Sequence, residues 1–174
     1  MVRAIFPGTF DPIHYGHIDI AKRATELFDE LIVAVYDRPL KKLLFSPEVR
    51  IALTKEAFAG EPKIKVMGYN TLTVEFCKEM DAKVIVRGLR VFSDFEHEFR
   101  MALANRRLAK EIEVIALITS EEHTFLSSTT VREIAALHGN VSTMVPPHVE
   151  KVLRTQMEKI GDQNRMDQYT SLRD

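Results

Sequence analysis

The sequence contains a single cysteine, Cys77, among 174 residues. One thiol excludes an internal disulfide and a zinc site built from several cysteines, and it agrees with a protein that works in the reducing cytoplasm. Cys77 lies in a segment of helical period, between an aromatic residue and a lysine, where we expect a buried and unreactive thiol.

An excess of charge of one sign is also missing. The chain has 24 Lys and Arg residues against 25 Asp and Glu residues, and its formal net charge is -1. This balance gives no general attraction to nucleic acid or to an anionic membrane, so neither is expected as a partner. Any site for an anion must therefore come from local clustering of donors.

Long apolar runs are absent as well. No stretch approaches the length of a transmembrane helix, and the apolar opening "VRAIF" meets Pro7 and Asp11 too early for a signal peptide. A hydrophobic content of 45% over 174 residues suits one globular domain with a real core. We expect a soluble, cytoplasmic protein with a domain over 1–160 and a polar, flexible tail over 161–174.

What the sequence does contain is a regular alternation of short β-branched runs and longer segments of helical period. Near-continuous apolar runs such as "LIVAV" and "VIALI" are typical of parallel strands covered on both faces. The alternation predicts an α/β fold with one doubly wound, five-stranded parallel sheet and C-terminal helices. The predicted strands are 2–6, 31–36, 63–67, 83–87 and 113–118, and the predicted helices are 15–28, 46–58, 72–80, 93–109, 130–138 and 146–160.

Several of these helices carry end signals in their sequences. Ser46 followed by Pro47 indicates an N-cap with proline in the first turn, and "SDFE" at 93–96 and "TVRE" at 130–133 have the form of a capping box. Gly139 is a candidate C-cap for the helix that precedes it.

The stretch "FPGTFDPIHYGH", residues 6–17, joins the first predicted strand to the first predicted helix. In a doubly wound sheet, ligands bind outside the carboxyl ends of the strands, and free N–H groups at a helix start attract anions. Gly8 and Gly16 leave room for close approach, while His14 and His17 share a helix face and can donate to phosphate. The alternative is a pair of turns with solvated histidines. A metal site on the two histidines is less favoured, because no third ligand has suitable spacing.

A second stretch decides between these interpretations. "PGTFDPIHYGH" resembles the [H/T]-x-G-H signature of the nucleotidylyltransferase superfamily, and "LSSTTVR" at 126–132 resembles its I-S-S-T-x-x-R signature. Each follows a predicted strand and opens a predicted helix. The resemblance implies the Rossmann-like nucleotidyltransferase fold, with Thr9, His17, Arg90 and Ser128 around one common cleft.

Three further segments narrow the resemblance to one family. "DRPLKKLLFSPEVR", "VIVRGLRVFSDFEHEFRMALANRRL" and "EEHTFLSSTTVRE" are similar to bacterial phosphopantetheine adenylyltransferases, and the similarity runs from about residue 3 to about residue 155. It implies transfer of an adenylyl group from ATP to phosphopantetheine in coenzyme A biosynthesis. It also implies a homohexamer, and whether coenzyme A is a feedback ligand stays open.

The resemblance assigns roles to individual residues. It implies that His17, Lys41 and Arg90 are catalytic. It implies substrate-binding roles for Thr9, Lys41, Thr73 and Arg87. The ATP-binding residues that it implies are Thr9, Phe10, His17, Gly88, Leu89, Arg90, Glu98, His123, Thr124, Phe125, Leu126, Ser127, Ser128 and Thr129. The chain departs from the family at His14, where threonine is usual, and at His97 and His123, where an aromatic residue is usual, so stacking contacts at 97 and 123 are in question.

The residue types suit this chemistry independently of the resemblance. A phosphate monoester is already an anion at neutral pH, so it needs positioning and charge stabilisation rather than a protein nucleophile. Mg²⁺ is expected with ATP, bound largely by phosphates and water, since the chain shows no dedicated carboxylate cage and no protein metal site is predicted. Two alternatives remain open: transfer to another phosphorylated acceptor such as nicotinamide mononucleotide, and a nucleotide-binding module without turnover.

Overall fold

The computed structural model describes residues 1–37 and 43–171, with the side chains of residues 93 and 162–171 excepted. All strand pairs in these ranges are parallel, and the five strands follow the order β3-β2-β1-β4-β5. This confirms the predicted doubly wound α/β fold. The elements in chain order are β1 (Arg3–Gly8), α1 (Tyr15–Leu27), β2 (Glu30–Tyr36), α2 (Pro47–Ala57), β3 (Ile64–Tyr69), α3 (Thr73–Glu79), β4 (Val84–Leu89), α4 (Phe92–Leu108), β5 (Glu113–Ile118), the 3-10 turn η1 (Glu121–His123), α5 (Ser128–Ala136) and α6 (Pro147–Ser171).

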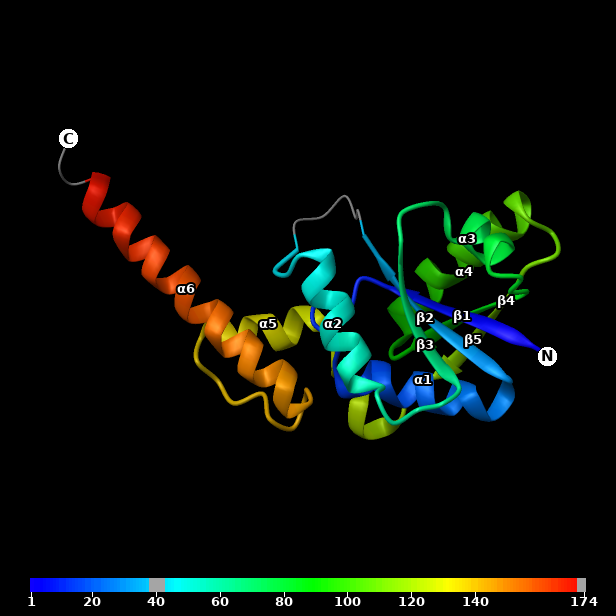
Figure 1. The fold of residues 1–174 in the computed structure, drawn as a ribbon, viewed down its shortest axis with the longest axis horizontal. Helices are drawn as coiled ribbons and strands as arrows, with labels where there is room; N and C mark the ends of the chain where they lie inside the picture. Colours follow the sequence, from blue (N-terminus) through cyan, green and yellow to red (C-terminus); the bar gives the residue numbers. More distant parts are fainter. Residues whose placement is uncertain (38–42, 172–174) are drawn as a thin grey trace.

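Helices cover both faces of the sheet (Figure 1). One apolar cluster joins α1, α2, α5 and α6 to alternate residues of the central strands, such as Leu31 and Val33 of β2. The second cluster joins α3 to the intervening residues, such as Ile32. Because successive side chains of a strand point to opposite faces, burial of both sets requires a continuous apolar strand.

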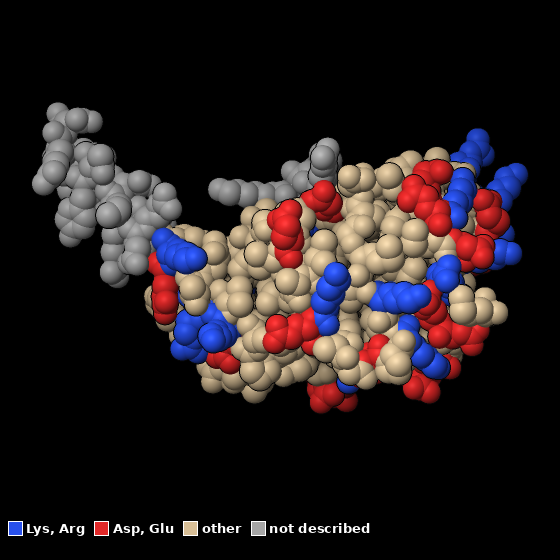
Figure 2. All heavy atoms as spheres, in the orientation of Figure 1, with Lys and Arg blue, Asp and Glu red and all other residues tan. Residues whose placement is uncertain are grey.

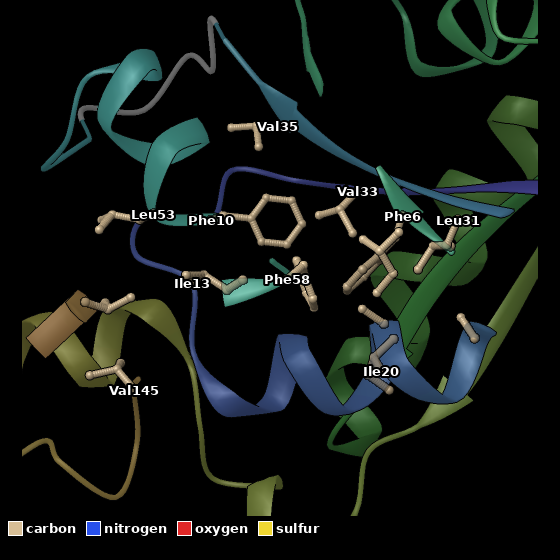
Figure 3. Packing of buried hydrophobic residues seen from close by; sticks show 14 of the residues in the cluster. Phe6, Phe10, Ile13, Ile20, Leu31, Val33, Val35, Leu53, Phe58 and Val145 are labelled. Atoms are coloured by element: carbon tan, nitrogen blue, oxygen red, sulfur yellow. The ribbon is translucent and has the colours of Figure 1, made fainter. Parts of the chain in front are cut away.

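Phe10 anchors the loop after β1 in the first of these clusters. Figure 3 shows its ring reaching into the core between Val33 and Leu53. The side chain is only 1% exposed although its backbone has a φ of 48°, a left-handed conformation that is uncommon for a bulky residue. A Cβ atom on Gly8 would lie 2.9 Å from the Phe10 ring, so the glycine permits this packing.

The end signals of the helices differ in their outcomes. Ser46 does cap α2, because its Oγ accepts a hydrogen bond from the Val49 N–H at 3.4 Å. The capping box predicted at 93–96 is wrong: α4 begins at Phe92, and Asp94 instead accepts a hydrogen bond from the Arg90 N–H at 3.1 Å. The carboxylate thereby holds the residue that precedes Val91, the N-cap of α4, and no side chain caps this helix in the described residues.

The capping box predicted at 130–133 is also wrong, because the helix begins about one turn earlier. The capping residue of α5 is Ser127, whose Oγ accepts from the Thr130 N–H at 3.0 Å. Gly139 is not the C-cap itself. It follows His138, which takes the left-handed conformation with a φ of 58°, and its N–H donates to the Ile134 carbonyl at 2.9 Å.

The last helix is longer than the sequence predicted. α6 continues through Gly161 to Ser171 and extends away from the sheet (Figure 1). The division into a domain over 1–160 and a flexible tail stays a prediction. None of the helices in the described ranges has an apolar stretch long enough to cross a membrane. On the face shown in Figure 2, the described basic and acidic side chains are interspersed, in keeping with the balanced composition.

Candidate active site

Two adjoining cavities open at the carboxyl ends of β1 and β4, which are neighbours in the sheet. The first, which we name the histidine cavity, has a volume of about 330 Å³. It is lined by residues of the loop after β1, the first turns of α1, α4 and α5, and the end of β4. Its lining residues are Phe6, Pro7, Gly8, Thr9, Phe10, His14, Gly16, His17, Ile20, Arg87, Gly88, Arg90, Asp94, Glu98, Thr119, Ser127, Ser128, Thr129 and Arg132.

The second cavity, which we name the tyrosine cavity, has a volume of about 380 Å³. Its lining is less charged than that of the histidine cavity and includes Leu72 and Met101 beside Tyr36 and Tyr69. The two cavities share one wall, formed by Pro7, Gly8, Thr9, Arg87 and Glu98. The other residues of the tyrosine cavity are Tyr36, Tyr69, Thr71, Leu72, Thr73, Ile85, His97, Met101, Ala102, Asn105 and Val114.

The two histidines of the opening stretch stack on each other at the start of α1, with ring centroids 3.7 Å apart. The His17 Nδ1 atom accepts a hydrogen bond from the His14 backbone N–H at 3.3 Å. A neutral His17 ring that accepts at Nδ1 carries its proton on Nε2, so Nε2 is a hydrogen-bond donor. The Phe10 ring packs edge-on against His17 at 4.9 Å and restricts the orientation of the imidazole.

Both imidazoles are held in the neutral form. Burial, followed by the nearby charges of Arg90 and His123, lowers the pKa of His14 from 6.5 to about 3. Burial also lowers the pKa of His17 well below 6.5, with His14, Arg90 and Arg87 contributing in the same direction. At neutral pH, His17 is therefore a neutral donor rather than a cation.

Arg87 stands in the wall between the two cavities. Its Nε and Nη2 atoms donate to the two carboxylate oxygens of Glu98 at 2.7 and 2.6 Å, and Nη1 donates to the Pro7 carbonyl at 2.7 Å. Within the described part of the chain, these bonds use three of the five guanidinium N–H donors, and two remain for a phosphate. The arginine is thus fixed in place before any ligand arrives.

Arg90 connects the starts of two helices across the histidine cavity. Its guanidinium donates to both carboxylate oxygens of Asp94, at 3.0 and 3.1 Å, and to the Leu126 carbonyl at 2.8 Å. Leu126 precedes the Ser127 cap of α5, so Arg90 holds the residues that open this helix against α4.

The start of α5 supplies the opposite side of the histidine cavity. The Ser128 hydroxyl donates to the Pro12 carbonyl at 2.9 Å, which fixes the helix start against the opening stretch. Ser127, Ser128 and Thr129 line the cavity at the end of the helix where backbone N–H groups lack intrahelical acceptors. A helix start of this kind favours bound phosphate.

The structure brings most of the predicted site residues together. Thr9, His17, Arg90 and Ser128 line the histidine cavity, as expected of the two signatures. Thr73 lines the tyrosine cavity. The other predicted residues that line one or both cavities are Phe10, Arg87, Gly88, Glu98, Ser127 and Thr129.

Other predicted residues take different positions. The Phe10 side chain is buried, so it supports His17 and offers a nucleotide little surface of its own. Leu126 is fully buried and reaches the site through its carbonyl, whereas Phe125 is 58% exposed. Lys41 lies outside the described residues. The predicted residues absent from the lining of both cavities are Leu89, His123, Thr124, Phe125 and Leu126.

Several lining residues were missed as site residues by the sequence analysis. Arg132 belongs to the quoted "LSSTTVR" segment, and its position at the end of that signature was an available signal. Asp94 pairs with Arg90 across four residues, a spacing that the sequence contains without distinguishing it from a surface pair. Tyr36 and Tyr69 end β2 and β3, and only the strand order places them beside Thr9.

Comparison with known proteins agrees with this geometry. The cytidylyltransferase-like family model matches residues 5–134, a range that contains both signatures and the sheet from the third residue of β1 onward. The fold, the cavity and this match define the class of the protein as a cytidylyltransferase-like enzyme domain.

Curated relatives give a narrower assignment. A phosphopantetheine adenylyltransferase of Roseiflexus sp. (strain RS-1) is 49% identical over 154 residues, which cover 88% of this chain and 96% of the relative. The phosphopantetheine adenylyltransferase of Desulfitobacterium hafniense (strain DSM 10664 / DCB-2) is 51% identical over 86% of this chain and 92% of the relative. That of Gloeobacter violaceus (strain ATCC 29082 / PCC 7421) is 50% identical over 87% of this chain and 94% of the relative. The chain belongs to the phosphopantetheine adenylyltransferase family.

The lowered histidine pKa values predict how stability depends on pH. Below about pH 6.5 the imidazoles of the unfolded chain bind protons, whereas buried His14 stays neutral down to about pH 3. The unfolded state therefore binds more protons in this range, and the free energy of unfolding falls with decreasing pH by up to about 1.4 kcal/mol per pH unit for each such histidine.

Urea unfolding across this pH range checks the effect in three proteins. His14→Thr introduces the residue usual in the family and should flatten the pH dependence relative to the wild type. Exposed His138, already in a left-handed conformation, offers the control His138→Asn, which should keep the wild-type slope. Equal slopes for wild type and His14→Thr would contradict the assignment.

Proposed function

We propose that this protein transfers the adenylyl group of ATP to 4′-phosphopantetheine and produces dephospho-coenzyme A and pyrophosphate. The observation that carries the proposal is the wall shared by the two cavities. Two substrates bound in adjoining cavities meet at Thr9, Arg87 and Glu98. The family membership supports this choice of donor and acceptor over nicotinamide mononucleotide.

In the proposed reaction, a phosphate oxygen of phosphopantetheine attacks the α-phosphorus of ATP. One P–O bond forms as the bond between the α-phosphorus and the bridging oxygen to the β-phosphate breaks, and the electron pair leaves with pyrophosphate. The attacking group is already an anion, so no proton has to be removed and no protein nucleophile is needed. The protein's contribution is to align the two anions and stabilise the charge that develops.

Residues of the histidine cavity supply that stabilisation in the proposal. The His17 Nε2–H, the N–H groups that open α5, and the guanidinium of Arg90 would contact the triphosphate. The two remaining donors of Arg87 would bind the acceptor phosphate across the wall, together with Thr9 and with Lys41, whose role follows from the family resemblance alone. Thr73 would line the path of the pantetheine arm in the tyrosine cavity.

Mg²⁺ enters this proposal as part of the substrate, bound to the phosphates of ATP and to water. In the described ranges, no group of three or more His, Cys, Asp or Glu residues could hold a metal ion. The cavity carboxylates Asp94 and Glu98 each pair with an arginine. This donor set suits a metal that arrives with its own phosphate ligands.

An acceptor comparison tests the proposed function. With Mg²⁺ and ATP, we expect pyrophosphate release with phosphopantetheine and little with nicotinamide mononucleotide. Dephospho-coenzyme A identified by mass spectrometry would confirm where the adenylyl group goes. A preference for the mononucleotide would overturn the choice of acceptor, and ATP binding without turnover of either compound would indicate a module without activity.

Replacement of His17 tests the phosphate donor. In His17→Asn, the amide oxygen can still accept from the His14 N–H, but the Nε2–H donor is lost. We expect kcat to fall by roughly a hundredfold or more, the effect of removing one donor to a developing charge. The matched control is His138→Asn, outside both cavities, which should keep the wild-type kcat. Near-normal turnover of His17→Asn at saturating ATP would contradict the assignment.

Coenzyme A is proposed as a feedback ligand of the same site. It contains both an adenine nucleotide and a phosphopantetheine arm, so one molecule has the parts to span the two cavities. The two cavities have lining residues in common, so they lie next to each other.

We propose the cytoplasm as the location of the protein. Its single cysteine, Cys77, is buried, and burial raises the pKa of the thiol to about 12, which suits a reducing compartment.

A homohexamer is proposed as the assembly. Phe92, Phe95 and Phe99 form a stacked row along α4 with centroids 6.3 and 5.8 Å apart, and they are 89%, 50% and 52% exposed. An apolar patch of this kind is typical of a subunit interface. Light scattering should give six times the chain mass of 19.9 kDa, and Phe95→Glu should reduce it. The control Leu137→Glu, at an exposed position after α5, should leave the mass unchanged. An unchanged mass for Phe95→Glu would contradict this interface.

A further inference from the structure

Arg50 is a charged residue buried outside the lining of both cavities. It lies on α2, its side chain has no exposed surface, and it belongs to neither signature of the superfamily. Removing a guanidinium from water is costly unless its donors are satisfied. Burial of Arg50 therefore requires acceptors close to its guanidinium.

The acceptors of Arg50 are backbone carbonyl groups from three parts of the chain. Nη1 donates to the Thr9 carbonyl at 2.8 Å and to the Tyr36 carbonyl at 2.7 Å. Nη2 donates to the Asp37 carbonyl at 3.2 Å, and Nε donates to the Phe45 carbonyl at 3.2 Å. One side chain thus joins the loop after β1, the end of β2 and the residue that precedes the Ser46 cap of α2.

Two of these partners belong to the cavities themselves. Thr9 lies in the shared wall, and Tyr36 lines the tyrosine cavity. A fixed carbonyl also fixes the plane of its peptide bond, because that bond does not rotate freely. Arg50 therefore sets the orientation of the Thr9–Phe10 peptide and the direction in which β2 ends.

Asp11 makes a second clamp on the same region. Its buried carboxylate accepts hydrogen bonds from the Leu44 N–H at 2.8 Å and the Phe45 N–H at 2.9 Å. Arg132 of the histidine cavity donates to Asp11. Phe45 is thus held through its N–H by Asp11 and through its carbonyl by Arg50, and the two clamps act on adjacent peptide groups.

We propose that Arg50 is a positioning residue for the acceptor: by holding the carbonyls of Thr9 and Tyr36, it sets the geometry of the shared wall and the tyrosine cavity. The inference rests on the proposed function. Arg50 reaches the histidine cavity through Thr9 of the shared wall, whereas the contacts at His17, Arg90 and Ser128 do not involve it. Loss of Arg50 should therefore affect the acceptor more than ATP.

Arg50→Lys tests the proposal, because lysine keeps the charge but cannot reproduce the planar set of donors. We expect kcat/KM for phosphopantetheine to fall by roughly ten- to hundredfold, because a misplacement of the reacting groups by about 1 Å can cost about a hundredfold in rate. KM for phosphopantetheine should rise and kcat should fall, while the ATP dissociation constant from calorimetry should match the wild type. Arg50→Gln, which keeps an amide donor without the charge, is the second variant.

Arg3→Lys is the matched control. Arg3 begins β1 at the opposite end of the strand from the cavities, and its guanidinium also bonds a backbone carbonyl, that of Met80, besides pairing with Glu30. The same substitution there should lower the melting temperature and leave both KM values and kcat at wild-type values. It separates a general loss of stability from a loss of alignment.

The outcomes distinguish the interpretations. Raised acceptor KM with unchanged ATP affinity supports positioning. A lower melting temperature with both KM values unchanged, equal weakening of ATP and acceptor, or failure of both Arg50 variants to fold while Arg3→Lys folds would overturn it. If the wild type forms no pyrophosphate with phosphopantetheine, the proposed function fails instead, and acceptor binding by calorimetry to wild type and Arg50→Lys still decides the role of Arg50.

Discussion

The ion pair between Arg87 and Glu98 lies in the wall that separates the two cavities, and both cavities depend on it. The pair is bidentate, and the Glu98 side chain is only 13% exposed, so water competes little for the contact. Arg87 also bonds the Pro7 carbonyl of β1. One side chain of β4 thus fixes the end of its neighbouring strand and a residue of α4 at the same time.

This arrangement follows from the strand order. Because β1 and β4 are adjacent and parallel, their carboxyl ends and the helices that follow them meet at one edge of the sheet. The two signatures, more than a hundred residues apart in the chain, meet there, where Ser128 bonds the Pro12 carbonyl. The distance between donor and acceptor sites is therefore set by rigid strands rather than by loops alone.

The sequence contained enough to predict the sheet, the order of its elements and most residues of the histidine cavity. The apolar strands are long and continuous, and each signature sits at a junction where position and residue type agree. Helix starts were less predictable. Capping by Ser127 and the role of Asp94 depend on which turn packs against Arg90, a tertiary contact that a local S-x-x-E pattern does not contain.

The tyrosine cavity and the role of Arg50 could not be predicted for a related reason. Tyr36 and Tyr69 become lining residues only because β2 and β3 lie side by side beyond β1. Arg50 lies in a predicted helix, where a charged residue is expected to be exposed, and the sequence around it does not indicate that it is buried. Its acceptors are backbone carbonyls, which every residue carries, so residue identity gave no signal.

Arg87 and Arg90 are held in the same way, each by one carboxylate and one backbone carbonyl. Carboxylates partly neutralise Arg87 and Arg90, but each also bonds a carbonyl oxygen, which fixes the guanidinium without cancelling its charge. The lining of the histidine cavity holds three arginines, Arg87, Arg90 and Arg132, against two carboxylates, Asp94 and Glu98. Burial is the main cause of the lowered pKa of His17, and the positive charges of Arg90 and Arg87 add to it because they oppose protonation of the ring. The same arginines would attract a polyphosphate, so the charges that help to keep His17 neutral also favour binding of the nucleotide.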